Sequence, residues 1–228
     1  MTASIPLTAL SDDQSQAWAR VSAALDAAGV DLDTGQTGPM PDTRGTVLAI
    51  TGKAGSGKTL LLAELTKTLV AAGVEIVTGD YEPRKRRDRR TLAVLAPTNK
   101  AASVLRTRGV PATTLHRILY SPVYDPEYEK IAEWLAGTAP RPVIEGMDDV
   151  ALDRASTFYA HTPSIPGALA AAGLRGSDFI TGWKRRDDPL DIGFVDESSM
   201  LDARQLDDLK ELFGTLVLFG DPAQLAPV

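Results

Sequence analysis

The chain has 228 residues, 43% of them hydrophobic, and a formal net charge of −6. It contains no cysteine, which excludes disulfides and thiolate metal sites, and no apolar run approaches the roughly 18 to 20 residues of a membrane span. The start of the chain lacks the basic and apolar regions of a secretory signal. We therefore expect a cytoplasmic domain of ordinary size with no membrane partner.

An amphipathic helix is the first element that the sequence predicts, over Leu10–Ala28. Ser11 is suited to the N-cap position, and Gln14 stands three residues later, as in a capping box. A connector rich in glycine, proline and threonine follows at Gly35–Arg44. We assign residues 1–45 to this helix and connector, ahead of the main domain.

From residue 46 onward, short β-prone apolar runs alternate with helical patterns. The expected strands are Thr46–Ile50, which reads as buried, Val74–Thr78, Thr91–Ala96, Ile192–Val195 and Thr215–Phe219, and the expected helices are Thr59–Ala72, Asn99–Arg108 and Asp202–Phe213. Such alternation predicts an α/β domain over 46–228, with a parallel sheet and helices on both of its faces.

A segment of different composition, about 121–189, interrupts this alternation. It is rich in proline, glycine and charge, its periodicity is poor, and it indicates an insertion with a strand at Phe179–Lys184. Its aromatic residues either stack on bases or form a small satellite core, which is the more common arrangement. These aromatics are Tyr120, Tyr124, Tyr128, Trp134, Phe158, Tyr159 and Trp183.

One short segment concentrates positive charge in an otherwise acidic chain. Arg84–Arg90 holds six basic side chains and one acidic side chain. Such a run either contacts the phosphates of a nucleic acid or forms a solvated loop.

A glycine-rich sequence, Gly52–Thr59, matches the full phosphate-loop pattern between a predicted strand and a predicted helix. Its backbone N–H groups are expected to surround the phosphates of ATP, and they belong to Gly52, Ala54, Gly55, Ser56 and Gly57. Lys58 is expected to reach the β- and γ-phosphates, and the Thr59 hydroxyl to bind Mg²⁺. The sequence therefore predicts ATP and Mg²⁺ as ligands.

Two adjacent carboxylates, Asp196 and Glu197, follow a predicted strand, where side chains of a parallel sheet face its ligand crevice. We expect Asp196 to hold Mg²⁺ and Glu197 to orient and deprotonate the attacking water. A later turn contains Gln224, a neutral amide suited to sensing the γ-phosphate. A proline-rich polar turn without that role fits the same residues equally well.

Taken in order, these strings resemble the motifs of superfamily 1 helicases, closest to the RecD-like branch, superfamily 1B, which moves 5′ to 3′. The strings are Leu10–Gln14, Gly52–Thr59, Ala96–Ala102, Thr114–Arg117, Val195–Met200 and Gly220–Val228, similar to motifs Q, I, Ia, Ib, II and III. The resemblance implies a RecA-like P-loop domain. It also implies that the insertion contains a wedge or pin subdomain, for which Phe179–Arg186 is a candidate.

The resemblance further assigns roles to single residues. It implies that Gln14 contacts adenine, that Gln224 takes part in catalysis beside Lys58 and Glu197, and that the partner is single-stranded DNA. The implied DNA contacts are Thr98, Asn99, Lys100 and His116. Other interpretations stay open: Gln14 completes a capping box, Thr98–Lys100 cap a helix, and His116 is structural.

Motifs IV to VI of that family lie in a second RecA-like domain, which supplies arginine fingers, and the chain ends at Val228 directly after motif III. We therefore expect a fragment, a truncated product or half of a split motor that binds Mg·ATP, hydrolyses it slowly and unwinds nothing alone. The alternatives are a non-translocating regulatory P-loop ATPase or nucleotide-dependent nucleic-acid-binding module, a small-molecule kinase, and an RNA helicase.

Overall fold

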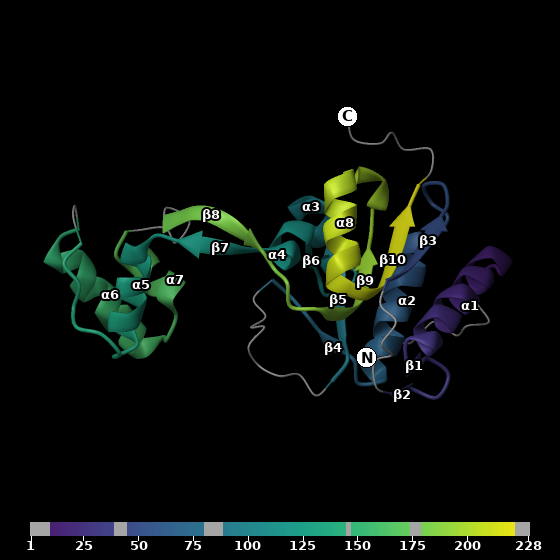
Figure 1. The fold of residues 1–228 in the computed structure, drawn as a ribbon, viewed down its shortest axis with the longest axis horizontal. Coiled ribbons are helices and arrows are strands. Elements are labelled where there is room, and N and C mark those ends of the chain that lie inside the picture. The colour runs from purple at the N-terminus through teal and green to yellow at the C-terminus, as the bar shows by residue number, and fades with distance from the viewer. Residues whose placement is uncertain (1–9, 39–44, 80–88, 145–146, 174–178, 222–228) are drawn as a thin grey trace. The chain divides into compact units, whose positions relative to one another are not determined.

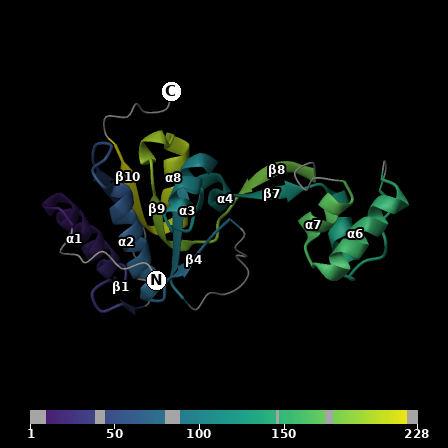
Figure 2. The same cartoon turned by 180° about the vertical axis from the view of Figure 1, so that it is seen from behind.

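The structure is a computed structural model that describes residues 10–38, 45–79, 89–144, 147–173 and 179–221. The chain divides into two compact units. Met1–Leu119 and Arg186–Val228 form the first, here called the core unit, and Tyr120–Arg185 form the second, the inserted unit. Figures 1 and 2 draw both units from opposite sides.

A six-stranded sheet is the centre of the core unit, and every strand pair in it is parallel. The strand order is β3-β10-β9-β5-β4, with β6 also paired to β5. The strands are β3 (Thr46–Thr51), β4 (Glu75–Ile76), β5 (Thr91–Ala96), β6 (Ala112–Thr114), β9 (Leu190–Val195) and β10 (Phe213–Gly220). Because all strands run in one direction, their C-terminal ends meet along a single edge, here called the carboxyl edge.

Helices cover both faces of this sheet (Figures 1 and 2). They are α1 (Asp12–Ala27), α2 (Lys58–Ala71), α3 (Asn99–Thr107), α4 (Leu115–Leu119) and α8 (Ala203–Leu212), with a short 3-10 helix at Ser198–Met200. In β5, Leu92 and Val94 join the cluster that includes buried residues of α1, α2 and α3. The alternating Ala93 and Leu95 face the other side, where α4 packs on β5 and α8 on β10. The predicted α/β fold class is confirmed.

Strand β3 differs from the prediction of a buried strand. It lies at one end of the strand order, paired only with β10 among the described strands, and Val47 is 41% exposed. Of its residues only Ile50 is buried. The apolar run was a correct signal for a strand but a wrong one for burial, because an edge strand in an α/β sheet carries the same residues with fewer neighbours.

The sequence predicted most ends of the helices and strands to within two residues. Ser11 caps α1 and forms the predicted capping box with Gln14. The strand expected at Val74–Thr78 is shorter, since β4 has only two residues. The glycine-rich connector contains β2 (Gln36–Thr37), which pairs with β1 (Val30–Asp31) and was not anticipated. Strand β6 and helix α4 were missed as well, because each is only a few residues long.

A buried ion pair joins two neighbouring strands at the edge opposite the carboxyl edge. Arg90 donates to Asp191 with an N–O distance of 2.7 Å, and the arginine is 9% exposed. Arg90 also donates to the carbonyl of Ala28, and Asp191 accepts from both the N–H and the hydroxyl of Thr91. The last member of the basic run is therefore part of the interior, while residues 84–88 lie outside the described residues.

The inserted unit combines an antiparallel ribbon with helices. Its elements are β7 (Tyr120–Tyr124), α5 (Pro126–Leu135), α6 (Asp149–His161), α7 (Ile165–Ala171) and β8 (Ile180–Arg185). The poor periodicity of the segment predicted none of these helices. Prolines stand in the first turns of α5 and α7, after the capping residues Asp125 and Ser164. The interpretation of a satellite core holds for Tyr128 and Trp134, and Phe179 packs against the same cluster, whereas Trp183 is 50% exposed.

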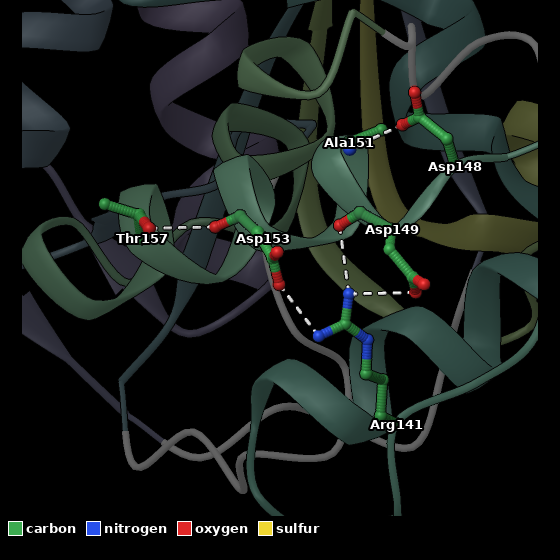
Figure 3. A network of polar contacts seen from close by, with 6 residues as sticks. All are labelled: Arg141, Asp148, Asp149, Ala151, Asp153 and Thr157. Atoms are coloured by element: carbon green, nitrogen blue, oxygen red, sulfur yellow. Dashed lines mark hydrogen bonds and ion pairs between the residues drawn. The ribbon is translucent and has the colours of Figure 1, made fainter.

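A network around Arg141 joins the segment between α5 and α6 to helix α6 (Figure 3). Its guanidinium donates to Asp153 at 2.7 Å and to Asp149 at 3.1 Å, and lies 5.6 Å from the ring centre of Trp134 in α5. Asp148 caps the same helix by accepting from the N–H of Ala151 at 2.7 Å. These exposed pairs each contribute only about 0.2–1 kcal/mol, so apolar packing dominates the unit.

The inserted unit leaves the core and returns to it at adjacent points. Leu119 ends the first part of the core unit and Arg186 begins the second. The Arg186 N–H donates to the Leu119 carbonyl at 2.8 Å. Within the described ranges, no helix has both the length and the apolar character needed to cross a membrane.

Candidate nucleotide-binding site

The phosphate loop, Gly52–Thr59, connects the end of β3 to the start of α2. Gly57 is the N-cap of α2 with a φ of 82°, and no side chain caps the first N–H groups of the helix. Gly55 has a φ of 83°. Because left-handed backbone favours glycine, these residues turn the chain without side chains over the helix N-terminus, leaving donors for an anion.

Lys58 is held by the loop itself. Its Nζ donates to the carbonyls of Gly52 at 2.5 Å and Lys53 at 3.0 Å. Thr59 lies half-buried beside it in the first turn of α2. A methyl group on Gly52 would come within 2.6 Å of the Ser56 hydroxyl, so a side chain there would force Ser56 to move. The predicted phosphate-binding residues are thus gathered around one cradle.

Asp196 and Glu197, here called the acidic step, follow β9 at the carboxyl edge. Asp196 is 7% exposed, and this burial is the main cause that raises the pKa of its carboxyl. The charge of Glu197 also raises this pKa, whereas an N–H donated by Glu197 and the charges of Lys58 and Arg108 lower it. The charge of Lys58 therefore favours the ionised form of Asp196, although the two residues come from distant segments of the chain.

Glu197 has an unusual backbone. Its φ of 53° and ψ of 41° make it the one described non-glycine residue with positive φ. The short helix Ser198–Met200 begins directly after it. A methyl group on Gly220 would lie 2.6 Å from the Ser198 hydroxyl, so the turn after the acidic step packs closely on the end of β10.

Asp221, which the sequence analysis did not select, also belongs to this site. Its Oδ2 accepts from the N–H of Ala54 at 3.0 Å, and its exposed fraction is 8%. The Gly52 N–H donates to the Gly220 carbonyl at 3.1 Å, so the end of β10 is joined to the loop twice. The rule that selected Asp196, a carboxylate at the end of a parallel strand, identifies Asp221 equally well. Gln224 lies outside the described residues.

A pocket of about 670 Å³ adjoins the phosphate loop on the side of α1. Gln14, Ala17 and Arg20 line it from α1, and Ile50 and Lys58 from the sheet and the loop. The Gln14 side chain accepts from the Ser11 N–H and donates to the Ser56 carbonyl at 3.1 Å. The capping box is thus present, and the same amide also holds the loop. The pocket is bounded by apolar and polar groups, as a nucleoside requires.

The residues expected to contact DNA lie at the ends of two other strands. Thr98 follows β5 and caps α3, since its hydroxyl accepts from the Ala101 N–H at 3.1 Å. Asn99 and Lys100 are exposed in the first turn of this helix. His116 is exposed in α4, directly after β6. All four therefore share the carboxyl edge with the phosphate loop and the acidic step.

The fold and the loop define a nucleotide-binding protein of the P-loop class. A family model described as an AAA domain matches residues 32–228, which is most of the chain, and the chain belongs to this family of P-loop ATPases. The match begins after α1, so Gln14 lies outside it. A search of curated proteins found no match.

Proposed function

We propose that this ATPase domain is a motor domain of a RecD-like superfamily 1B DNA helicase, which uses ATP to move along single-stranded DNA in the 5′ to 3′ direction. The main support is the arrangement of the carboxyl edge, where β10 is bonded to the phosphate loop through Asp221 and Ala54 and lies directly beside β9, which leads into the acidic step. A phosphate cradle and a proposed metal-binding carboxylate at the ends of strands in one sheet fit a single metal-bound triphosphate.

The site residues fit Mg·ATP in chemical terms. The open N–H groups at the start of α2 and the Lys58 ammonium suit phosphate oxygens. Thr59 and Asp196 are the proposed Mg²⁺ ligands, and a buried carboxylate with a raised pKa is one that a cation stabilises in its ionised form. When bound, Mg²⁺ neutralises charge on the phosphates. Glu197 is proposed to take the proton of the attacking water, and Gln224 to contact the γ-phosphate.

The proposed DNA contact rests on the carboxyl edge. The N-terminus of α3 carries the positive end of the helix dipole, and the exposed Asn99 and Lys100 add donors to it. Together with His116 they suit a phosphate backbone, which fits single-stranded DNA and equally RNA.

The ribbon of the inserted unit is the proposed wedge or pin. The half-exposed Trp183 pairs across it with Pro122 and is followed by the cations Lys184 and Arg185. An exposed aromatic next to cations suits stacking on a base and contact with its phosphate.

The proposed motor also includes a second RecA-like domain as partner. A translocating motor needs two domains around the nucleotide, and an arginine supplied to the transferred phosphoryl group raises turnover by about 10³–10⁵. We therefore expect hydrolysis to be slow wherever such an arginine is not supplied.

Titration with a fluorescent ATP analogue in Mg²⁺ tests the nucleotide site. We expect Lys58→Ala to weaken binding by at least about tenfold, because it removes the charge in the cradle. Lys130→Ala changes an exposed lysine of the inserted unit and serves as the control. Equal affinity of the two variants would disprove the site.

Single-stranded DNA added to the ATPase assay, with the second domain present, tests the motor. Stimulation that is lost in Lys100→Ala supports a DNA-driven ATPase. ATP binding without any stimulation favours the regulatory ATPase instead.

A further inference from the structure

A carboxylate of the protein already accepts a hydrogen bond from one of the N–H groups of the phosphate loop. Asp221 Oδ2 accepts from the Ala54 N–H at 3.0 Å, in a position where only 8% of the residue is exposed. The N–H groups of such a loop normally serve phosphate oxygens. The protein has thus placed an anionic group of its own where the anionic ligand is expected to bind.

The strand order concentrates further negative charge beside it. Strand β10, which ends at Gly220, lies between β3, which leads into the loop, and β9, which leads into the acidic step. Asp221 therefore stands between Ala54 and Asp196 along the carboxyl edge. Asp196 and Asp221 are both buried, so water screens their charges weakly.

We propose that Asp221 acts as a charge filter, which makes nucleotide binding depend strongly on Mg²⁺. This inference rests on the proposed binding of ATP at the phosphate loop. A free triphosphate meets the repulsion of Asp221 as well as that of the acidic step. Mg²⁺ bound to the nucleotide neutralises about two of its negative charges and so weakens this repulsion. Asp221 is a positioning residue with an electrostatic effect, distinct from the proposed metal ligand Asp196.

The test compares the ATP affinity of each variant in Mg²⁺ with its affinity in EDTA. Asp221→Asn keeps an oxygen that accepts from Ala54 and removes only the charge. We expect its affinity in EDTA to rise about tenfold and its affinity in Mg²⁺ to change less than about twofold, so that the ratio of the two falls. Asp221→Glu keeps the charge and should keep the ratio of the unchanged protein.

A matched control is Asp207→Asn, which removes an exposed carboxylate of α8 far along the chain from the loop. Asp221→Ala adds a check against structural damage, because loss of the hydrogen bond weakens both affinities while loss of charge still lowers their ratio. An unchanged ratio in both Asp221→Asn and Asp221→Ala would overturn the filter and leave Asp221 as a brace. If the unchanged protein binds ATP in neither buffer, the proposed function itself fails.

Discussion

At the scale of single residues, Glu197 has a strained backbone at the position proposed for the catalytic base. A non-glycine residue in left-handed conformation costs on the order of 1 kcal/mol or more, and such strain collects at functional sites. Here it turns the chain sharply at the end of β9, before the short helix at Ser198–Met200. The conformation of the acidic step therefore lowers the free energy of unfolding of the protein.

Replacement of Glu197 separates the two effects. Asn tolerates left-handed backbone, so we expect Glu197→Asn to raise the free energy of unfolding by up to about 1 kcal/mol. Its ATP hydrolysis should fall by about 10² or more, because the proposed base is gone. Denaturant unfolding and steady-state ATPase assays measure both. Glu197→Ala should lose the same activity without the gain, and an Asn variant less stable than the Ala variant contradicts the strain.

The buried carboxyl of Asp196 gives a pH-dependent prediction. Because burial raises its pKa in the folded state above the ordinary 3.8, the ionised form costs folding free energy at higher pH. That cost disappears as the pH falls below the unfolded-state pKa. Without Mg²⁺, Asp196→Asn should therefore melt at a higher temperature than the unchanged protein at neutral pH. The difference should shrink on acidification, and a difference that grows instead would refute the assignment.

At the scale of elements, α1 is fastened to the phosphate loop by one amide. Gln14 completes the capping box of α1 and also donates to the Ser56 carbonyl. A substitution that keeps the first contact and removes the second can therefore test what the helix contributes to binding.

Gln14→Glu is such a substitution, because glutamate accepts in a capping box but cannot donate to a carbonyl. We expect stability close to that of the unchanged protein and an ATP affinity lowered by about threefold to tenfold. Gln14→Ala should lose the affinity and, in addition, about 1 kcal/mol of stability. Thermal unfolding and nucleotide titration supply the measurements. Unchanged affinity in Gln14→Glu would separate α1 from nucleotide binding.

At the scale of the whole molecule, the Arg90–Asp191 pair holds together β5, β9 and the end of α1. We expect Arg90→Ala to lower the free energy of unfolding by about 3 kcal/mol, because it leaves the largely buried carboxylate of Asp191 without its positive partner, with only the hydrogen bonds from Thr91 remaining. Arg89→Ala, at the exposed neighbouring residue, should change stability by less than about 0.5 kcal/mol. Urea denaturation of both variants measures the difference, and equal losses would show that the pair is not critical.

The sequence predicted those features that depend on neighbouring residues. Strand β5 has the predicted bounds, and the capping box at Ser11 is present, because both arise within a few residues. The strand-end rule that selected Asp196 also selects Asp221, but its contact with Ala54 joins residues 167 positions apart, and no local pattern predicts that pairing. The helices of the inserted unit were missed for another reason: proline reads as a breaker unless its place in the first turn is known.

The hydrogen bond between Arg186 and Leu119 has a consequence for how the protein is assembled. It joins the two core residues between which the 66 residues of the inserted unit, Tyr120–Arg185, are placed in the sequence. A segment whose two ends are already joined can be exchanged for another without reopening the sheet. We therefore expect that a shorter or longer segment can replace the inserted unit between Leu119 and Arg186 without a change in the structure of the nucleotide site.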